Sequence, residues 1–344
     1  MEERDDLERG GVTRRDFLKI SGLTTGGMVL GSLGHIPPCF GKEGYPADNI
    51  TMIVNTKAGG GRDLFARAIA PYISKHLKEV VPGAKGGNVR IRNEGGGGGR
   101  KGFAMLFDSK ADGYTLGLVD TSAITDTIVE APEFDFTKLT FLLLGYYSTK
   151  MVVAPKKGFK SWDEVVTAMK TGPVKISVSQ FGASNHVASI IMNEKAKTNF
   201  KIIVYNGTSE SMNAVLRGDV QLSLLTENAA VGLLEAGEVK VLLELTKGTA
   251  YPGAVSLKET GFPELADGMN NSIYVVAPPN LPEEPKNILI ETMKRAANDK
   301  EFEAWAKKTK INLGKIYGKD AQNLYLGFIK YYENIAPILL KHLK

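Results

Sequence analysis

The sequence contains very few of the side chains that bind metals or form disulfides. Its 344 residues include one cysteine, Cys39, and four scattered histidines: His35, His76, His186 and His342. A single cysteine cannot form an intramolecular disulfide, and a structural zinc site needs four neighbouring cysteine or histidine ligands. We therefore predict that the protein uses no metal and no cofactor.

The sequence also lacks a strong charge of either sign. Its 43 Lys and Arg residues against 38 Asp and Glu residues give a net charge of +5, too small an excess to indicate nucleic acid as a partner. A hydrophobic fraction of 43% with 24% charged residues is typical of a globular protein, and the length favours two domains. No segment beyond the N-terminal region is long and apolar enough to cross a membrane.

The N-terminal region has the pattern of an export signal. Residues 13–19 have the sequence TRRDFLK and precede a weakly apolar, glycine-containing stretch over 20–33. This stretch is too short to span a hydrocarbon core of about 30 Å, whereas two arginines before such a stretch are typical of a twin-arginine signal peptide. We predict that residues 1–44 are a signal peptide and linker, and that the protein is exported to the periplasm.

After Tyr45 the sequence alternates between strands and helices. A β-branched strand over 50–55 leads into the loop 56–63, after which apolar residues recur at helical spacing. Asp63 is suited to cap the N-terminus of this helix or to complement its partial positive charge. Further strands over 89–93 and 115–119, separated by a short helix, give the order βαβαβ.

The same alternation restarts after an extended, apolar passage over 139–154. Strands are predicted over 175–179, 200–205, 221–226 and 239–245, with helices between them. A stretch rich in proline then leads to at least two amphipathic helices at the C-terminus. The repeated alternation indicates a second α/β lobe.

Glycines and polar residues follow several of the predicted strands. In open α/β sheets, ligands bind at the carboxyl ends of the strands, where helix N-termini attract anions. Gly59, Gly60 and Gly61 would bring bare backbone close to a ligand, and Lys57 and Arg62 frame them with positive charge. This composition favours a carboxylate, although glycines that only shape a tight turn are the alternative at this point.

The motifs of common enzymes are incomplete. Gly102 follows Arg100 and Lys101 where a P-loop requires a serine or threonine for magnesium. Ser184 lies two residues before His186, so both belong to one turn, and no GxSxG nucleophile motif is present. We therefore expect His186 to be a helix-start or core-edge residue and predict no catalytic residues.

Four blocks of the sequence together resemble one family. They are the strand and AGGGxD core within 45–67, the glycine-rich block and ADGYTL segment over 93–116, the KGFKSW segment over 157–162, and the block over 205–220. These blocks occur in register along nearly the whole chain after residue 44. They are similar to those of the solute-binding receptors of tripartite tricarboxylate transporters, also called the Bug family.

The resemblance implies an α/β fold of the type II-like, two-lobed periplasmic binding proteins, in which each lobe is a mixed sheet flanked by helices and the ligand cleft lies between the lobes. We place lobe 1 at 45–147 and 270–344, and lobe 2 at 148–269. The resemblance also implies a monomer that captures a small carboxylate, either a di- or tricarboxylate or an aromatic acid, and delivers it to integral-membrane transporter subunits. The predicted ligand-binding residues are Thr56, Lys57, Ala58, Gly59, Gly60, Gly61, Arg62, Asp63, Thr121, Ser122, Ser179, Gln180, Gly182, Ala183, Ser184, Asn185, Tyr205, Asn206, Gly207 and Glu227.

Two loops depart from the usual pattern of the family. The first has Asn55, Thr56, Lys57 and Arg62, which suggests a more cationic pocket, and the second has Gln180, Phe181 and Asn185 in place of small residues. Two other functions stay open on the sequence: a secreted α/β enzyme acting on a phosphate ester, and a ligand-sensing partner of a membrane kinase.

Overall fold

The computed structural model describes residues 44–129 and 134–344. Apart from Gly44, the predicted signal peptide and linker lie outside the described residues. Residues 42–344 belong to one compact unit. No described helix has the length and apolar character needed to cross a membrane.

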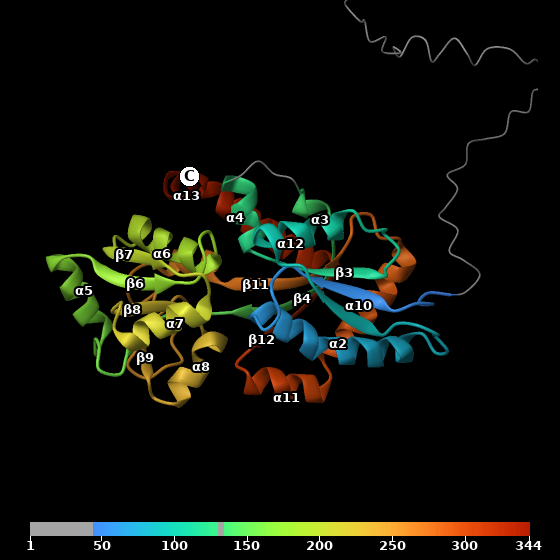
Figure 1. The fold of residues 1–344 in the computed structure, drawn as a ribbon, viewed down its shortest axis with the longest axis horizontal. Coiled ribbons are helices and arrows are strands. Elements are labelled where there is room, and N and C mark those ends of the chain that lie inside the picture. Colours follow the sequence, from blue (N-terminus) through green and yellow to red (C-terminus); the bar gives the residue numbers. More distant parts are fainter. Residues whose placement is uncertain (1–43, 130–133) are drawn as a thin grey trace, which may run out of the picture. The chain divides into compact units, whose positions relative to one another are not determined.

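The first sheet, sheet 1, has six strands in the order β12-β4-β11-β3-β1-β2 (Figure 1). The strands are β1 (Ile50–Val54), β2 (Val89–Asn93), β3 (Thr115–Asp120), β4 (Thr140–Ser148), β11 (Asn271–Ala277) and β12 (Asn312–Tyr317). Its helices are α2 (Gly61–Val80), α3 (Arg100–Phe107), α4 (Ser122–Val129), α10 (Glu283–Ala297), α11 (Lys300–Lys308), α12 (Gly318–Asn334) and α13 (Ala336–Leu343).

The second sheet, sheet 2, also has six strands, in the order β10-β9-β5-β8-β6-β7. The strands are β5 (Lys150–Pro155), β6 (Val174–Val178), β7 (Phe200–Val204), β8 (Leu222–Thr226), β9 (Val239–Glu244) and β10 (Val255–Ser256). Its helices are α5 (Trp162–Thr171), α6 (Ser184–Lys195), α7 (Thr208–Arg217) and α8 (Glu227–Glu235), whereas the short helix α9 (Ala266–Met269), on the return to sheet 1, contacts α12.

The two sheets share one pairing pattern and differ at one edge, where β12 pairs antiparallel with β4 but β10 pairs in parallel with β9. In sheet 1, β1 pairs in parallel with β2 and β3, and β11 pairs antiparallel with β3. In sheet 2, β6 pairs in parallel with β7 and β8, and β5 pairs antiparallel with β8. The predicted architecture of two mixed sheets flanked by helices is therefore confirmed.

Two chain segments connect the sheets. Only Thr149 separates the end of β4 in sheet 1 from the start of β5 in sheet 2. The chain returns from β10 through α9 to β11, which inserts antiparallel between β3 and β4. The strands β11 and β12 were not predicted from the sequence, because proline-rich and helical segments surround both of them.

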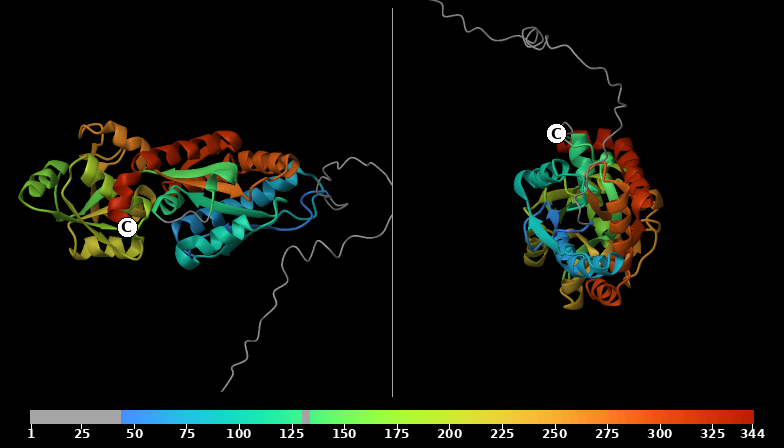
Figure 2. Two further views of the ribbon diagram at one scale, coloured as in Figure 1. Left: turned by 90° about the horizontal axis from the view of Figure 1, so that it is seen from above. Right: turned by 90° about the vertical axis from the view of Figure 1, so that its right-hand side faces the viewer.

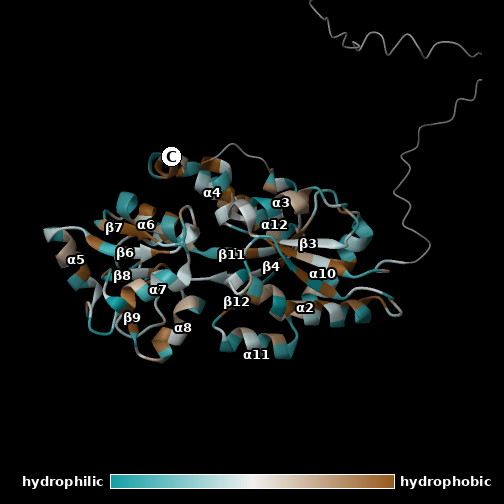
Figure 3. Ribbon diagram, in the orientation of Figure 1, coloured by the Kyte–Doolittle hydropathy of each residue, from teal (hydrophilic) through white to brown (hydrophobic). Residues whose placement is uncertain are grey.

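The core of sheet 1 follows from alternation along its strands. Met52 and Val54 belong to the buried cluster that contains α2, whereas Ile53 belongs to the cluster that contains α3 and α12. On α2, Phe65, Ile69, Ile73 and Leu77 are fully buried at a helical spacing. Figure 3 shows the resulting alternation of hydrophobic and hydrophilic residues along such helices.

The C-terminal helix α13 contacts both sheet regions. It packs against α4 on the side of sheet 1 and against α6 on the side of sheet 2 (Figure 2, red). Glu194 Oε1 on α6 lies 2.7 Å from Lys341 Nζ and 2.6 Å from His342 Nε2. The chain therefore joins the two sheets a third time through side-chain contacts.

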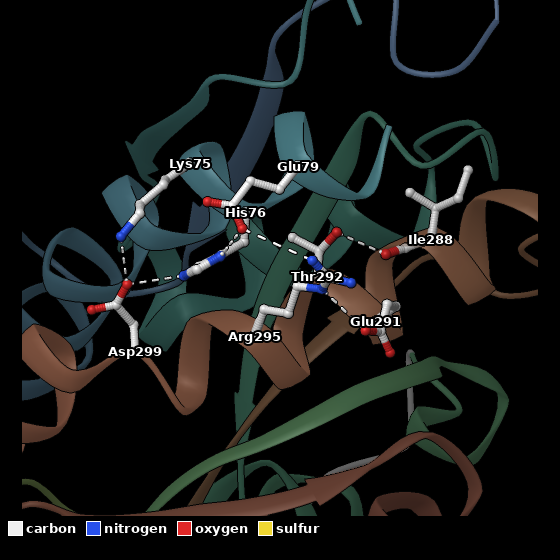
Figure 4. A network of polar contacts seen from close by, with 8 residues as sticks. All are labelled: Lys75, His76, Glu79, Ile288, Glu291, Thr292, Arg295 and Asp299. Atoms are coloured by element: carbon white, nitrogen blue, oxygen red, sulfur yellow. Dashed lines mark hydrogen bonds and ion pairs between the residues drawn. The ribbon is translucent and has the colours of Figure 1, made fainter. Parts of the chain in front are cut away.

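A polar network fastens α2 to α10 and α11 (Figure 4). Asp299 caps the N-terminus of α11, and its Oδ2 accepts a hydrogen bond from Lys75 Nζ at 2.9 Å and lies 2.9 Å from His76 Nε2. His76 Nδ1 lies 2.8 Å from Glu79, which lies 3.9 Å from Arg295. Asp299 is the buried centre of this network.

Replacing Asp299 by asparagine is expected to destabilise the protein by about 1–2 kcal/mol at pH 7, because the amide keeps the cap but loses the charged hydrogen bond with Lys75 and the negative charge at the start of α11. Burial alone would raise the pKa of Asp299, but hydrogen bonds from Lys75, His76 and the Glu301 N–H outweigh it and lower the pKa to about 2. A lowered native pKa stabilises the fold above the unfolded pKa of about 3.9. The difference between the proteins should therefore shrink as the pH falls from about 4 to 2.

Urea unfolding of both proteins at pH 7, 4 and 3 would measure this difference. The control is Glu291→Gln, which removes an exposed ion pair with Arg295 and should change stability by less than about 0.5 kcal/mol. A pH-independent difference for Asp299→Asn would contradict the electrostatic explanation.

Candidate functional site

The strand order of each sheet reverses beside one strand. In sheet 1 the chain crosses from β1 to β2 on one side and then passes back beyond β1 to β3 on the other side; in sheet 2 it crosses from β6 to β7 and then back beyond β6 to β8. Loops that diverge in this way leave room for a ligand beyond the carboxyl ends of the strands. All of the predicted binding residues lie at or next to strand ends of this kind.

The loop between β1 and α2 is fixed by Asp63. This carboxylate, 2% exposed, accepts hydrogen bonds from the Gly59 N–H at 2.8 Å, from Arg67 Nε at 3.0 Å and from Asn93 Nδ2 at 2.9 Å. Asp63 is the third residue of α2, and it therefore reaches back over the N-cap, Gly60, as an N3 carboxylate does in a capping box. The predicted role of Asp63 at this helix N-terminus is confirmed.

A second glycine run packs against the same loop. A Cβ atom at Gly99 would lie 2.7 Å from the Asn55 carbonyl oxygen, and one at Gly102 would lie 2.9 Å from Asn55 Cβ. Gly99 also has a φ of +99°, in the left-handed region that favours glycine. These glycines thus allow α3 to approach the end of β1, which gives the run a packing role.

The Arg62 side chain contacts residues at the ends of strands in sheet 1. Its guanidinium forms an ion pair with Asp120 at the end of β3 and donates to Asn55 Oδ1 at 3.0 Å and to Ser122 Oγ at 3.1 Å. Ser122 Oγ in turn donates to Asp120 Oδ1 at 2.7 Å. The positive charge that we expected Arg62 to offer a ligand is therefore balanced by Asp120, and Lys57 is the exposed cation of this loop.

The loop between β6 and α6 is held by backbone and histidine contacts. The Gln180 N–H donates to the Tyr205 carbonyl at 2.8 Å, and the Gly182 N–H donates to His186 Nδ1 at 3.0 Å. Burial, followed by the nearby His342, lowers the pKa of His186 to about 4, which keeps Nδ1 free to accept that bond. His186 is thus a buried helix-start residue, as predicted.

The side chains of Ser179 and Asn185 close this loop. They bond to each other at 2.8 Å, and Asn185 Nδ2 also donates to the Leu224 carbonyl of β8 at 3.2 Å. The neighbouring loop, Tyr205 to Gly207, leads into α7, with the exposed Asn206 donating its N–H to Glu210 at 3.2 Å. The loop after β6 is therefore held to both of its neighbouring strands.

The start of α8 links the two sheets. Glu227 accepts hydrogen bonds from the Tyr251 hydroxyl at 2.9 Å and from Thr149 Oγ1 at 3.2 Å. The next residue, Asn228, accepts one from Ser148 Oγ at 2.9 Å. Its Nδ2 lies 3.8 Å from the position of a Cβ atom at Gly61, which places the start of α8 beside the start of α2.

A buried lysine joins the two connecting segments. Lys150, 1% exposed at the start of β5, donates its ammonium to the Met269 carbonyl, just before β11. Burial lowers the pKa of Lys150 to about 7, although the nearby Asp120 favours its charged form. This hydrogen bond joins the two segments that connect sheet 1 with sheet 2.

The contacts connect the predicted site residues in groups. Loop 56–63 is joined to Ser122 through Arg62 and to the start of α8 through Gly61, whereas loop 179–185 is joined to Tyr205. The residues that fix these loops were not predicted from the sequence; they are Asn55, Asn93, Asp120 and Asn228. Asp120 had a usable signal, since an acidic residue directly precedes the predicted Thr121 and Ser122.

Comparison with known proteins identifies the family. A model of the tripartite tricarboxylate transporter family receptor matches residues 73–332, which is more than half of the chain. The chain therefore belongs to this family of periplasmic solute-binding receptors, in agreement with the resemblance found in the sequence.

Relatives in other bacteria have similar coverage. A UPF0065 protein from the gbd 5' region of Cupriavidus necator is 28% identical, over 72% of this chain and 75% of the relative. Protein BugT of Bordetella pertussis is 26% identical, over 69% of this chain and 73% of its own length.

Solved structures share the fold. An R. palustris protein with adipate is 21% identical, with a TM-score of 0.74, and the match covers 86% of this chain and 98% of that one. MatC from Rhodopseudomonas palustris with bound malate is 19% identical, with a TM-score of 0.71, and the match covers 85% and 100%. These likenesses agree with the two-lobed architecture of periplasmic binding proteins.

Proposed function

We propose that the protein captures a small carboxylate in the periplasm, either a di- or tricarboxylate or an aromatic acid, and delivers it to a tripartite tricarboxylate-type membrane transporter. In this proposal it acts as a monomer, catalyses no reaction and is exported through the twin-arginine pattern over residues 13–19. The family supports the receptor role, and the adipate and malate of the two structural relatives support a carboxylate ligand.

One observation carries the carboxylate proposal. Four helices follow strands β1, β6, β7 and β8 in the chain, and none of their N-cap residues makes a side-chain cap hydrogen bond. The N-caps are Gly60, Ala183, Gly207 and Thr226. The free N–H groups of a helix N-terminus can bind an anion. Of these four helices, α6 has no acidic residue in its first turn to offset its partial positive charge, whereas α2, α7 and α8 carry Asp63, Glu210 and Glu227 there. We therefore expect α6 to contribute most to an anionic ligand.

Ligand binding would draw the two sheets together. Binding shifts an equilibrium between open and closed forms only as far as the ligand prefers one of them. A carboxylate that contacts loop 56–63 and loop 179–185 at once makes more contacts in the closed form. The two connecting segments, at Thr149 and at Asn270, would act as the hinge.

The first experiment is a thermal-shift screen of the full-length chain, followed by calorimetry. The panel contains malate, citrate, adipate, benzoate, amino acids and nucleotides. We expect one or more of the carboxylates to raise the midpoint and to be recovered chemically unchanged. A shift with nucleotides or phosphate esters alone would contradict the receptor proposal and favour an enzyme.

The variant Lys57→Ala tests which loop the ligand contacts. Removing this exposed ammonium should weaken the binding of a dicarboxylate by about 1 kcal/mol, or about fivefold in affinity, because a charge-assisted hydrogen bond is lost. The matched control is Lys110→Ala, an exposed lysine between α3 and β3, at the opposite ends of the strands. Equal affinities of the two variants would show that the Lys57 ammonium does not contact the ligand.

A further inference from the structure

The most exposed large hydrophobic side chains are found at the strand ends. Among the described residues, Phe181 is 61% exposed and Leu64 is 54% exposed, whereas the other exposed large hydrophobic residues reach at most 39%. Phe181 lies in the loop between β6 and α6, and Leu64 lies in the first turn of α2. One such residue therefore belongs to each sheet, beside the uncapped helix N-termini.

The loop that carries Phe181 is held in one conformation. Gln180 and Gly182, on either side of it, both have positive φ angles, of 54° and 72°. Their N–H groups are bonded to the Tyr205 carbonyl and to His186, so neither residue can relax without losing a contact. The ring of Phe181 lies 5.1 Å from the buried ring of His186, at a tilt of 49°. The fixed backbone of this loop therefore keeps the Phe181 ring exposed to solvent.

An exposed phenylalanine in a fixed loop leaves a hydrophobic area open to water. Burying that area against an apolar group is favourable in proportion to the area removed from water. A carboxylate bound at the neighbouring helix N-termini would place the rest of its carbon skeleton close to this ring. A hydrocarbon skeleton would gain from the contact, and a hydroxylated one would lose hydration without a hydrogen-bonding partner.

From these observations we infer that Phe181 determines specificity, and that the ligand is a carboxylate with an apolar body, either an aromatic ring or a hydrocarbon chain without hydroxyl groups. This inference rests on the proposed function and narrows its ligand class. It favours acids such as adipate or benzoate over short hydroxy acids such as malate.

The test measures the affinities of adipate, benzoate and malate by calorimetry for the full-length chain and three variants. Phe181→Ala should lower the affinity for the better-bound apolar acid about ten- to thirtyfold, in line with the hydrophobic area lost. The affinity for malate should change by less than about twofold. Phe181→Leu keeps an apolar side chain and should lose only about two- to fivefold. Leu216→Ala, on α7 with 39% exposure, is the matched control and should change nothing.

The outcomes separate this inference from the proposed function. If malate binds more tightly than both apolar acids, or if Phe181→Ala weakens all three acids equally, the specificity role is overturned while the receptor proposal stands. If none of the acids in the screen binds to the unmodified chain, the proposed function fails and this inference fails with it. Selective loss of apolar acids in Phe181→Ala, partly restored in Phe181→Leu, supports both.

Discussion

Replacing Arg62 by methionine is expected to destabilise the protein by about 3–5 kcal/mol, because it leaves the buried carboxylate of Asp120 without its cation. Asp120 is 2% exposed, and Ser122 remains as a hydrogen-bond donor to it. The carboxylate at the end of β3, which then keeps the nearby Lys150 as a cation, should also weaken the binding of an anionic ligand. Urea unfolding and calorimetry with the best carboxylate would measure the two effects separately.

A double-mutant cycle distinguishes the ion pair from simple loss of packing. Asp120→Asn alone leaves Arg62 partly buried without an anion, and the double variant Arg62→Met with Asp120→Asn removes both charges. We expect the double variant to lose at least about 1 kcal/mol less stability than the sum of the single variants. Additive losses would show that the pair contributes no coupling, and that Arg62 does not stabilise the fold through Asp120.

Replacing Asp63 by alanine is expected to cost about 2–4 kcal/mol of stability and to weaken the ligand by about tenfold or more. The substitution removes the common acceptor of Gly59, Arg67 and Asn93, so the glycine-rich loop loses the contacts that hold its N–H groups in place. Burial alone would raise the pKa of Asp63, but these hydrogen bonds outweigh it and lower the pKa. Chemical unfolding and calorimetry provide the two measurements.

The matched control for this effect is Asp320→Ala. Asp320 also lies in the first turn of a helix, α12, but it is exposed. Its replacement should change stability by no more than about 0.5 kcal/mol and leave ligand affinity unchanged. If Asp63→Ala lowers stability while the ligand binds as before, loop 56–63 does not depend on Asp63 for its binding geometry.

Much of the fold could be predicted because it depends on local patterns. The strand over 89–93 has the predicted bounds. Helix α7 ends at Arg217 with Gly218 in a left-handed conformation, which is a local glycine signal of the same kind. The passage over 139–154 is extended as predicted, but it consists of two strands that belong to different sheets. Hydrophobicity alone cannot show this division, because both strands are buried on both faces.

The positions of the candidate site residues along the chain could be predicted, but their contact partners could not. Glycines, a positively charged pair and hydroxyl groups at strand ends were visible in the sequence, and the structure joins several of them. The partner of Arg62 was not visible, because Asp120 lies 58 residues away and becomes its neighbour only through the parallel pairing of β1 and β3. The exposure of Phe181 was equally hidden, since a phenylalanine is more often buried.

The sequence by itself determined the alternation of strands and helices, the glycine-rich turns and the family, because each depends on residues that are close along the chain. Only the tertiary structure decided which charges reach a ligand. The sheet order brings Asp120 to Arg62 and leaves Lys57 exposed. It also places the start of α8 beside Gly61 and sets Lys150 across the two connecting segments. The physical reason is that the charge available at a site depends on which groups are close in space and excluded from water, and the packing of the sheets fixes both.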